Sequence, residues 1–423
     1  MNIHDYAHLS QNGTNWTAAF EAAMASLRGQ GGGVLEVPAG EYPTGSIRLC
    51  SHMTLLLQSG AVLRYIQDKA AYPLVPLEFE GVAGLMYQSC LYAQDEEDVV
   101  ITGGGTVDGQ GSFWWRMMRE EGGTDYPRPY LVCFADCRRV TLENVRLINS
   151  PAWTVHPLRC QDVTVRGVRI KNPADSPNTD GINPDSCQDV RIHDCTIDVG
   201  DDCIAIKSGT EATKRHIPCE RIIITNCHFL HGHGGVVLGS EMSGDIRNVV
   251  VSSCVFYETD RGIRLKTRRG RGGTVEGIQL FNLTMEKVMC PFVFNMYYFC
   301  GADGKMKRVW DKNPYPVDAG TPCLRDVSIT GVRARKCSAC AAFFYGLSEM
   351  PVEGVSMNDV VVEMDPDGPS GLPAMMEGCP EMQGAGFFLR NARGVDLRGV
   401  KVRGVRGEVI DTDDSVQLEG DRA

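Results

Sequence analysis

A short pattern of apolar and polar positions recurs along the chain from about residue 138. Each copy has apolar residues at its third, fifth, eighth and tenth positions, as in RRVTLENVRL, QDVTVRGVRI and ERIIITNCHF. An apolar spacing of two in β-branched runs is typical of strands and not of helices. The sequence contains nine copies, whose third residues are Val140, Val163, Val190, Ile222, Val249, Ile278, Val327, Val355 and Val395.

The spacing within and between copies predicts the fold. The step of three between the fifth and eighth positions indicates a bend, often marked by Asn, Gly or Asp, because alternate residues of one strand face the same side. Most copies recur every 23 to 32 residues, with two longer gaps, as in solenoids. No helical segment separates consecutive copies, which excludes βαβ crossovers. We therefore predict an all-β fold, a parallel β-helix of about ten coils over about residues 95–405.

The segment before the repeats predicts a cap. WTAAFEAAMASL reads as a helix over about residues 16–27, with Thr14 or Asn15 as the N-cap and Gly29 and Gly31 at its end. A solenoid needs its open end covered, so we expect a capping helix at the N-terminus. The glycines of GGGTVDGQG lack the flanking strand and helix of a dinucleotide site and read as turns.

The chain reads as one domain, because no linker or change in composition divides its 423 residues. We assign about 1–60 to the cap region and expect the polar stretch of about 406–423 to leave the coils. With 43% hydrophobic and 22% charged residues, the chain can bury a sizeable core.

Charge and cysteine content narrow the possible partners and the cellular setting. A net charge of −11 argues against binding to nucleic acid or to a membrane surface. The start, MNIHDYAHLSQNGTNW, shows no signal-peptide pattern, and 17 cysteines without a close-spaced framework suit reduced thiols. We expect a cytoplasmic protein. Cys337 and Cys340 form a lone CxxC without further ligands, so we predict no zinc site.

Reactive side chains follow the apolar strands of four successive copies. Asp180, Asp202, His233 and Lys266 each lie 11 to 17 positions after the third residue of a copy. Since stacked coils lie about 4.8 Å apart, these side chains should share one wall of the β-helix. A solitary charge on such a face is usually only solvated, but four in similar places indicate a site.

Adjacent carboxylates suggest the chemistry of this wall. Asp201 and Asp202 repel each other, an arrangement typical of acid/base sites because it raises one pKa. Glycoside hydrolysis needs one carboxylic acid to protonate the leaving oxygen and one carboxylate to activate water or attack directly. Asp180, Asp201 and Asp202 could supply both, which predicts a glycoside hydrolase. Their spacing is compatible with either inversion or retention.

The next coils add an imidazole and cations. His233 stands between glycines that let the backbone approach a ligand, although a lone histidine is often structural. The basic run that follows reads either as a solvated face or as a grip on a sugar carboxylate, which indicates a uronic acid. The sequence shows no cluster of metal ligands. The run comprises Arg264, Lys266, Arg268, Arg269 and Arg271.

Four segments in order resemble the signature motifs of the polygalacturonases, glycoside hydrolase family 28. They are NTDGINPDSC (178–187), GDDCIAIKSG (200–209), GHGGVVLGSEMSG (232–244) and RGIRLKT (261–267), and INSPAWTVHP (148–157) is also similar. The resemblance implies a right-handed β-helix and an inverting hydrolase of galacturonate-containing oligosaccharides that needs no metal or cofactor.

Carried over by motif position, the resemblance also implies roles. Asp201 would be the general acid, Asp180 and Asp202 would activate water, and His233 would support the site. Arg264 and Lys266 would hold the substrate carboxylate. The remaining candidates for substrate contact are Tyr298, with Tyr297 as its competitor, His156 and Glu241.

The residues of the motifs NTDGINPDSC, GSEMSG and RLKT are more similar to those of the bacterial exo-acting branch of the family than to those of secreted endo-acting members. The motifs do not separate homogalacturonan from rhamnogalacturonan or xylogalacturonan. Two alternatives of other classes are a β-helix polysaccharide lyase and a carbohydrate-binding β-helix without catalytic activity.

Overall fold

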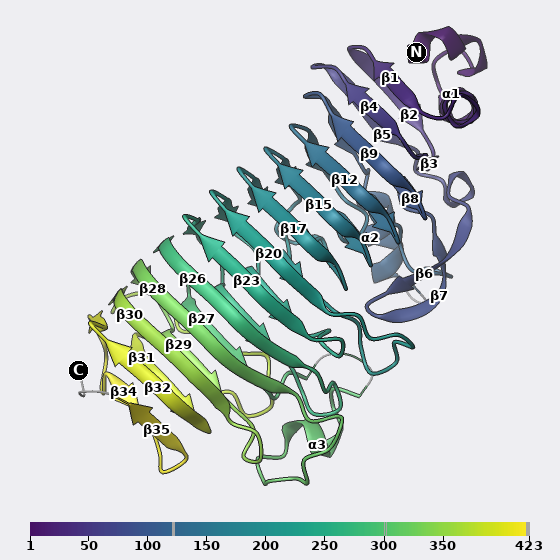
Figure 1. Cartoon of the computed structure of the whole chain (residues 1–423). Helices are drawn as coiled ribbons and strands as arrows, with labels where there is room; N and C mark the ends of the chain where they lie inside the picture. Colours follow the sequence, from purple (N-terminus) through teal and green to yellow (C-terminus); the bar gives the residue numbers. More distant parts are fainter. Residues whose placement is uncertain (121–122, 300, 302, 420–423) are drawn as a thin grey trace. The chain divides into compact units, whose positions relative to one another are not determined.

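The computed structural model describes residues 1–120, 123–299, 301 and 303–419, and the chain divides into two compact units, residues 1–201 and 202–423. Both units consist of coils of parallel strands, as the repeat predicted (Figure 1). In each unit the strands of successive coils pair in register, so that the same positions of the repeat stack on one another.

The first unit has two parallel sheets. The smaller sheet contains β3 (Ile47–Arg48), β8 (Leu91–Gln94), β11 (Val132–Ala135) and β14 (Val155–Leu158). The larger sheet contains β1 (Gly33–Val37), β2 (Gly40–Thr44), β4 (Met53–Leu57), β5 (Ala61–Tyr65), β9 (Glu97–Thr102), β10 (Thr106–Asp108), β12 (Arg138–Glu143), β13 (Arg146–Ile148), β15 (Gln161–Arg166), β16 (Arg169–Lys171), β17 (Gln188–His193) and β18 (Thr196–Asp198).

Helices and one hairpin accompany the coils of the first unit. The hairpin pairs β6 (Leu74–Phe79) with β7 (Val82–Tyr87) in antiparallel register. The helical segments are η1 (Ile3–Leu9), α1 (Thr17–Gln30), η2 (Lys69–Ala71) and α2 (Ser112–Arg119).

The second unit repeats the two-sheet plan. One sheet contains β19 (Asp202–Ile206), β22 (Gly234–Gly239), β25 (Arg261–Lys266), β27 (Cys290–Asn295), β29 (Cys340–Tyr345), β31 (Ala385–Arg390) and β34 (Ile410–Asp411). The other strands are β20 (Cys219–Thr225), β21 (His228–Leu230), β23 (Ile246–Ser252), β24 (Val255–Tyr257), β26 (Thr274–Glu286), β28 (Cys323–Cys337), β30 (Val352–Met364), β32 (Ala392–Arg398), β33 (Lys401–Arg403) and β35 (Val416–Glu419). A short helix, α3 (Lys307–Trp310), lies between β27 and β28.

Apolar columns form the core of both units. In the first unit Val140, Val163 and Val190 pair in register and are at most 1% exposed. In the second unit the third residue of every copy from Ile222 to Val395 pairs with the next in the same way. Cys195, Cys227 and Cys254 occupy the eighth position of their copies and are likewise buried as small side chains of the core.

The bend predicted within each copy is a single residue in the left-handed region. The seventh position of all nine copies has a positive φ, and it is occupied by Asn144, Gly167, Asp194, Asn226, Ser253, Asn282, Gly331, Asp359 and Gly399. Glycine, asparagine and aspartate adopt this conformation at low cost, which explains their frequency there.

The N-terminal cap is α1, which packs against η1, β1 and β3 (Figure 1). Its buried face comprises Ala19, Phe20, Ala23, Met24 and Leu27. Of the two N-cap candidates, Asn15 accepts a hydrogen bond from the Thr17 N–H at 3.0 Å, whereas Thr14 bonds to Gln11. Gly31 ends the helix with a φ of 81°, and Gly29 lies inside it.

The expectation that about residues 406–423 leave the coils is wrong for the described part of this stretch. β34 pairs with β31, and β35 pairs with β32. The short alternation VQLE explains the second pairing, because Val416 and Leu418 stack on Ala392 and Val395 and so continue the apolar columns.

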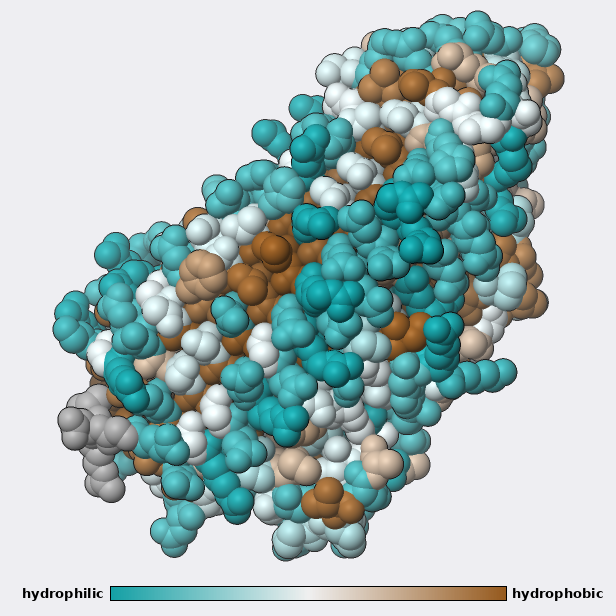
Figure 2. All heavy atoms as spheres, in the orientation of Figure 1, coloured by the Kyte–Doolittle hydropathy of each residue, from teal (hydrophilic) through white to brown (hydrophobic). Residues whose placement is uncertain are grey.

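Polar side chains cover much of the face seen in Figure 2, and apolar side chains show between them. Scattered exposed apolar residues are ordinary for a folded protein. Among the described residues, the helices lack the length and apolar character needed to span a bilayer.

Candidate active site

Two of the three expected catalytic carboxylates lie in the first unit, and the structure brings them together. A carboxylate oxygen of Asp180 and one of Asp201 lie within 4.8 Å of each other. Asp180 is 4% exposed and accepts a hydrogen bond from Asn183 Nδ2 at 2.9 Å. The third, Asp202, follows Asp201 directly and begins β19 of the second unit.

His156 lies on β14 in a buried aromatic cluster of the first unit. Its ring is 4.6 Å from that of Tyr130 and 4.9 Å from that of Trp153. The residue is 1% exposed, and its Nδ1–H donates to the Asn183 carbonyl at 3.0 Å. Asn183 therefore touches both Asp180 and His156, so the motif NTDGINPDSC joins these two candidates through one residue.

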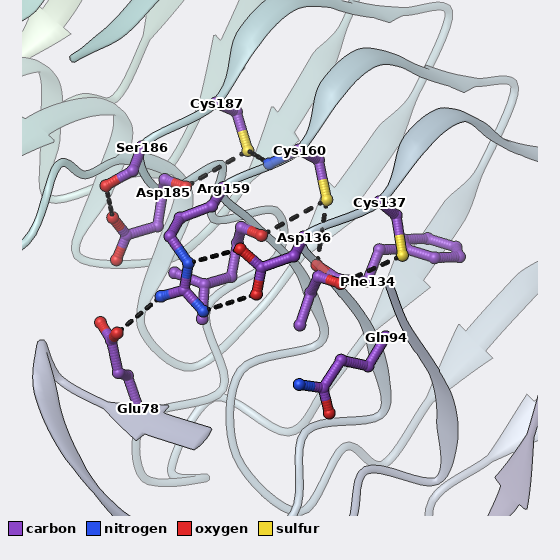
Figure 3. Close-up of polar contacts among 12 residues, drawn as sticks. Glu78, Gln94, Phe134, Asp136, Cys137, Arg159, Cys160, Asp185, Ser186 and Cys187 are labelled. Carbon is purple, nitrogen blue, oxygen red and sulfur yellow. Dashed lines mark hydrogen bonds and ion pairs between the residues drawn. The ribbon is translucent and has the colours of Figure 1, made fainter. Parts of the chain in front are cut away.

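The hairpin of β6 and β7 is attached to the same unit by an ion-pair network (Figure 3). Arg159 donates to Glu78 of the hairpin at 2.6 Å and to both oxygens of Asp136 at 2.8 Å. Beside this network Cys137, Cys160 and Cys187 occupy successive coils, and Cys187 Sγ accepts from the Cys160 N–H at 3.3 Å.

Asp202 is paired with Arg264 and Lys266, the two cations expected to hold the substrate carboxylate. Lys266 Nζ lies 2.7 Å from one oxygen of Asp202, and Arg264 Nη1 lies 3.4 Å from the other. Burial by itself would raise the pKa of Asp202, but Lys266 and Arg264 outweigh it and hold that pKa well below its usual range. Asp202 is therefore an ionised carboxylate.

The strand next to Asp202 explains one of the motif glycines. Asp202 pairs with Gly234 of β22, and a Cβ at Gly234 would lie 3.0 Å from Asp202 Oδ1 and 2.5 Å from Val237 Cγ2. Only glycine lets this strand approach the carboxylate so closely. His233, the residue directly before β22, is exposed.

A buried ion pair lies in the same unit. Lys207 Nζ donates to Glu241 Oε2 at 3.1 Å, with side-chain exposures of 5% and 10%. Burial would raise the pKa of Glu241, but Lys207, Arg271 and Lys266 lower it to about 2. Glu241 is therefore an ionised partner of Lys207, a contact that the sequence did not predict. A lysine in the apolar run CIAIKSG was the available signal.

The structure distinguishes the two tyrosine candidates. The Tyr298 ring lies 5.5 Å from the Arg264 guanidinium and 5.1 Å from Lys266 Nζ. Tyr297 is fully buried and lies against Lys312 and Arg269 instead. Of the two, Tyr298 is therefore the one beside the expected carboxylate clamp.

The basic run divides into two functional parts. Arg264 and Lys266 share one face of β25 and reach Asp202. The three arginines after the strand are buried and bind acidic side chains of the loops. Arg268 and Arg271 both pair with Glu211, and Arg269 pairs with Glu349. The reading of the run as a solvated face is therefore wrong.

One group of possible metal ligands lies on another part of the first unit. Donor atoms of His52, Glu97 and Asp98 lie within 4.8 Å of one another. Arg139, however, pairs with Glu97 at 2.7 Å and with Asp98 at 2.6 Å. Its guanidinium already neutralises the two carboxylates, so this exposed group is a salt-bridge cluster.

Comparison with known proteins identifies the family. Residues 80–372 match the model of glycosyl hydrolases family 28. The chain is 36% identical over 375 residues to a probable polygalacturonase of Vitis vinifera. The aligned region covers 86% of this chain and 74% of that protein. It is 30% identical over 306 residues to an endo-polygalacturonase of Pectobacterium carotovorum subsp. carotovorum, covering 69% of this chain and 74% of that protein.

A solved structure shares the fold. The crystal structure of a hyperthermoactive exopolygalacturonase from Thermotoga maritima superimposes with a TM-score of 0.79 at 29% identity, covering 96% of this chain and 92% of that one. The fold is the right-handed parallel β-helix that the resemblance implied. On the matched motifs, the family model and the shared fold, the chain belongs to glycosyl hydrolases family 28 and is a glycoside hydrolase of the polygalacturonase type.

Proposed function

We propose that this enzyme hydrolyses the α-1,4-galacturonosidic bonds of pectic oligosaccharides from one chain end, with inversion at the anomeric carbon. The observation that carries the proposal is that Asp202 is buried and ionised. Because Lys266 and Arg264 keep this buried carboxylate ionised, its oxygens can accept a hydrogen bond from the attacking water and orient it. The same cations, with Tyr298 beside them, can attract the carboxylate of a uronic acid.

In this mechanism Asp201 protonates the leaving oxygen, and Asp180 and Asp202 orient and deprotonate the attacking water. The hydrogen bond from Asn183 holds Asp180 in one orientation. His233 supports the site, and His156 and Glu241 shape the region that receives the sugar. No metal takes part in any of these steps.

Exo action is supported by the structural similarity to the Thermotoga exopolygalacturonase and by the residues of the motifs, which resemble those of exo-acting members. The relatives also include an endo-polygalacturonase, and the pattern of products distinguishes the two modes of action. Incubation with homogalacturonan oligomers, and sizing of products over time, should show release of short units of one length from one end. Early random fragments would exclude exo action, and faster cleavage of rhamnogalacturonan or xylogalacturonan oligomers would exclude this substrate.

Two further measurements test the chemistry. Proton NMR of the first product should show the β-anomer, and an α-anomer would exclude inversion. Asp201→Asn should lower kcat by about two to four orders of magnitude, because it removes the general acid. Asp198→Asn, on β18 of the same unit, is the matched control and should hydrolyse at the wild-type rate. Comparable rates for both variants would contradict the assignment of Asp201.

We also propose that the enzyme works in the cytoplasm on imported oligomers. The support is its cysteines: sixteen lie in the described part of the chain, where all are free thiols and most are buried. A protein with so many reduced thiols suits a reducing compartment. Fractionation of the source cells tests this directly, and recovery of the enzyme outside the cytoplasmic fraction would reject it.

A further inference from the structure

Tyr297 and Tyr298 are consecutive residues after β27, but they lie in different surroundings. Tyr298 lies over Arg264 and Lys266, the cations that pair with Asp202. The Tyr297 ring is fully buried, and Lys312 Nζ lies 3.5 Å from its centroid. Because the two residues are adjacent, a contact that holds Tyr297 in place also restrains Tyr298, which is proposed to contact the substrate.

Lys312 is placed in an unusual way. Lysines normally bury the aliphatic stem and leave the ammonium in water. Here the residue is half-buried, but its Nζ is shielded from solvent and finds no hydrogen-bond acceptor among the described residues. Its neighbours are the faces of the Tyr297 and Tyr345 rings, at 3.5 and 5.0 Å. Since burial of an ammonium without hydrogen bonds is unfavourable, the aromatic faces must supply the attraction.

Arg269 fixes the chain around this lysine. Its guanidinium donates to the carbonyls of Arg308 and Asp311 at 2.8 and 2.6 Å, and it also pairs with Glu349. It lies 5.4 Å from the Tyr297 ring as well. The backbone on the N-terminal side of Lys312 is thus anchored, which directs its side chain into the space beside Tyr297.

We propose that Lys312 is a positioning residue for substrate binding: its ammonium clamps the Tyr297 ring and thereby holds Tyr298 in place beside Arg264 and Lys266. This inference rests on the proposed function, in which Tyr298 contacts the sugar. Lys312 itself does not touch the substrate. Its loss should weaken binding and leave the chemical step largely intact.

The clamp should depend on pH. Burial, and after it the charge of Arg269, lower the pKa of Lys312 to about 8, against the smaller opposing effects of Cys379, Glu377 and Asp311. Because the pKa is depressed, the cation is present below about pH 8 and is lost above it. The two rings stay neutral in this range, since burial raises the pKa of Tyr297 to about 12 and also raises that of Tyr345.

Steady-state kinetics on galacturonate oligomers between about pH 6 and 9 test the clamp. Lys312→Met should raise KM about tenfold with kcat close to wild type, the pattern of lost uniform binding. The wild-type KM should rise above about pH 8, where Lys312 loses its proton, whereas Lys312→Arg should keep a low KM without that rise. Tyr297→Leu should raise KM as Lys312→Met does, without a further increase in the double variant.

The matched control is Lys287→Met, which removes an exposed lysine 5.2 Å from the Tyr257 ring. It should leave KM unchanged. NMR of the lysine-labelled wild type provides a measurement without turnover, because ring currents should shift the ε-methylene protons of Lys312 upfield. Absence of that shift, or an unchanged KM in Lys312→Met, would overturn the proposal. A wild type that shifts these protons but hydrolyses no galacturonide would instead overturn the proposed function.

Discussion

Replacement of Lys266 by methionine tests whether the cations at Asp202 support the fold as well as the substrate. The Lys266 and Asp202 side chains are 8% and 1% exposed, so solvent screens their 2.7 Å pair very little. Removing one partner of a buried pair usually costs about 3 to 5 kcal/mol, because the other charge stays buried. Arg264 remains 3.4 Å from Asp202, so we expect a loss near the lower limit, about 3 kcal/mol of unfolding free energy.

The effect should also depend on pH in a defined direction. The folded pKa of Asp202 is depressed below its ordinary value of 3.8, so the pair stabilises the fold above that pH. The stability is lost as the pH falls through the folded pKa. Lys266→Met should therefore differ most from the wild type near neutrality, and the difference should shrink below about pH 4.

Urea unfolding at several pH values measures both effects. A double-mutant cycle with Asp202→Asn separates the pair from the rest of the site, and the two substitutions together should cost clearly less than the sum of each alone. Lys287→Met, which breaks an exposed pair with Glu258, is the control and should change stability little. The pair does not stabilise the fold if Lys266→Met costs no more than this control, or if its cost is the same with and without the Asp202 carboxylate.

Three further outcomes follow from the contacts. Gly234→Ala should cost about 1 to 3 kcal/mol and lower kcat, measured by urea unfolding and turnover, because its methyl group would overlap with Val237 and press on Asp202. Arg159→Met should speed limited proteolysis within the hairpin of β6 and β7, since it removes the hairpin's ion pair; unchanged cleavage would contradict that role. Among the described cysteines, Cys323 and Cys379 should be alkylated first in the native protein, because only these two are not fully buried, and mass mapping can check the order.

The coils could be predicted from the sequence because every copy repeats the same physical constraint. A buried column needs an apolar residue at each level, and the bend needs a residue that tolerates positive φ, so both leave a mark in all nine copies. The last coil was missed because it carries too little of this pattern. VQLE offers only two inward positions among aspartates and glutamates, too few to establish a period of two.

The site could be predicted only where the alternation along a strand determines the face to which a side chain points. Arg264 and Lys266 are two residues apart on β25, so they share a face and reach the same carboxylate. The arginines that follow lie beyond the strand end, where alternation no longer applies. Their partners, such as Glu211 and Glu349, come from loops far away in sequence.

The partners of buried lysines cannot be predicted from the repeat, but the need for a partner can. Lys207 and Lys312 are separated in sequence from the groups that hold them, Glu241 in one case and Tyr297 with Tyr345 in the other. Nothing in the repeat specifies those contacts. An ammonium is nevertheless costly to bury, so a lysine within an apolar strand such as CIAIKSG must have an anion or an aromatic face nearby. Such a lysine predicts that a partner exists, and only the folded chain identifies it.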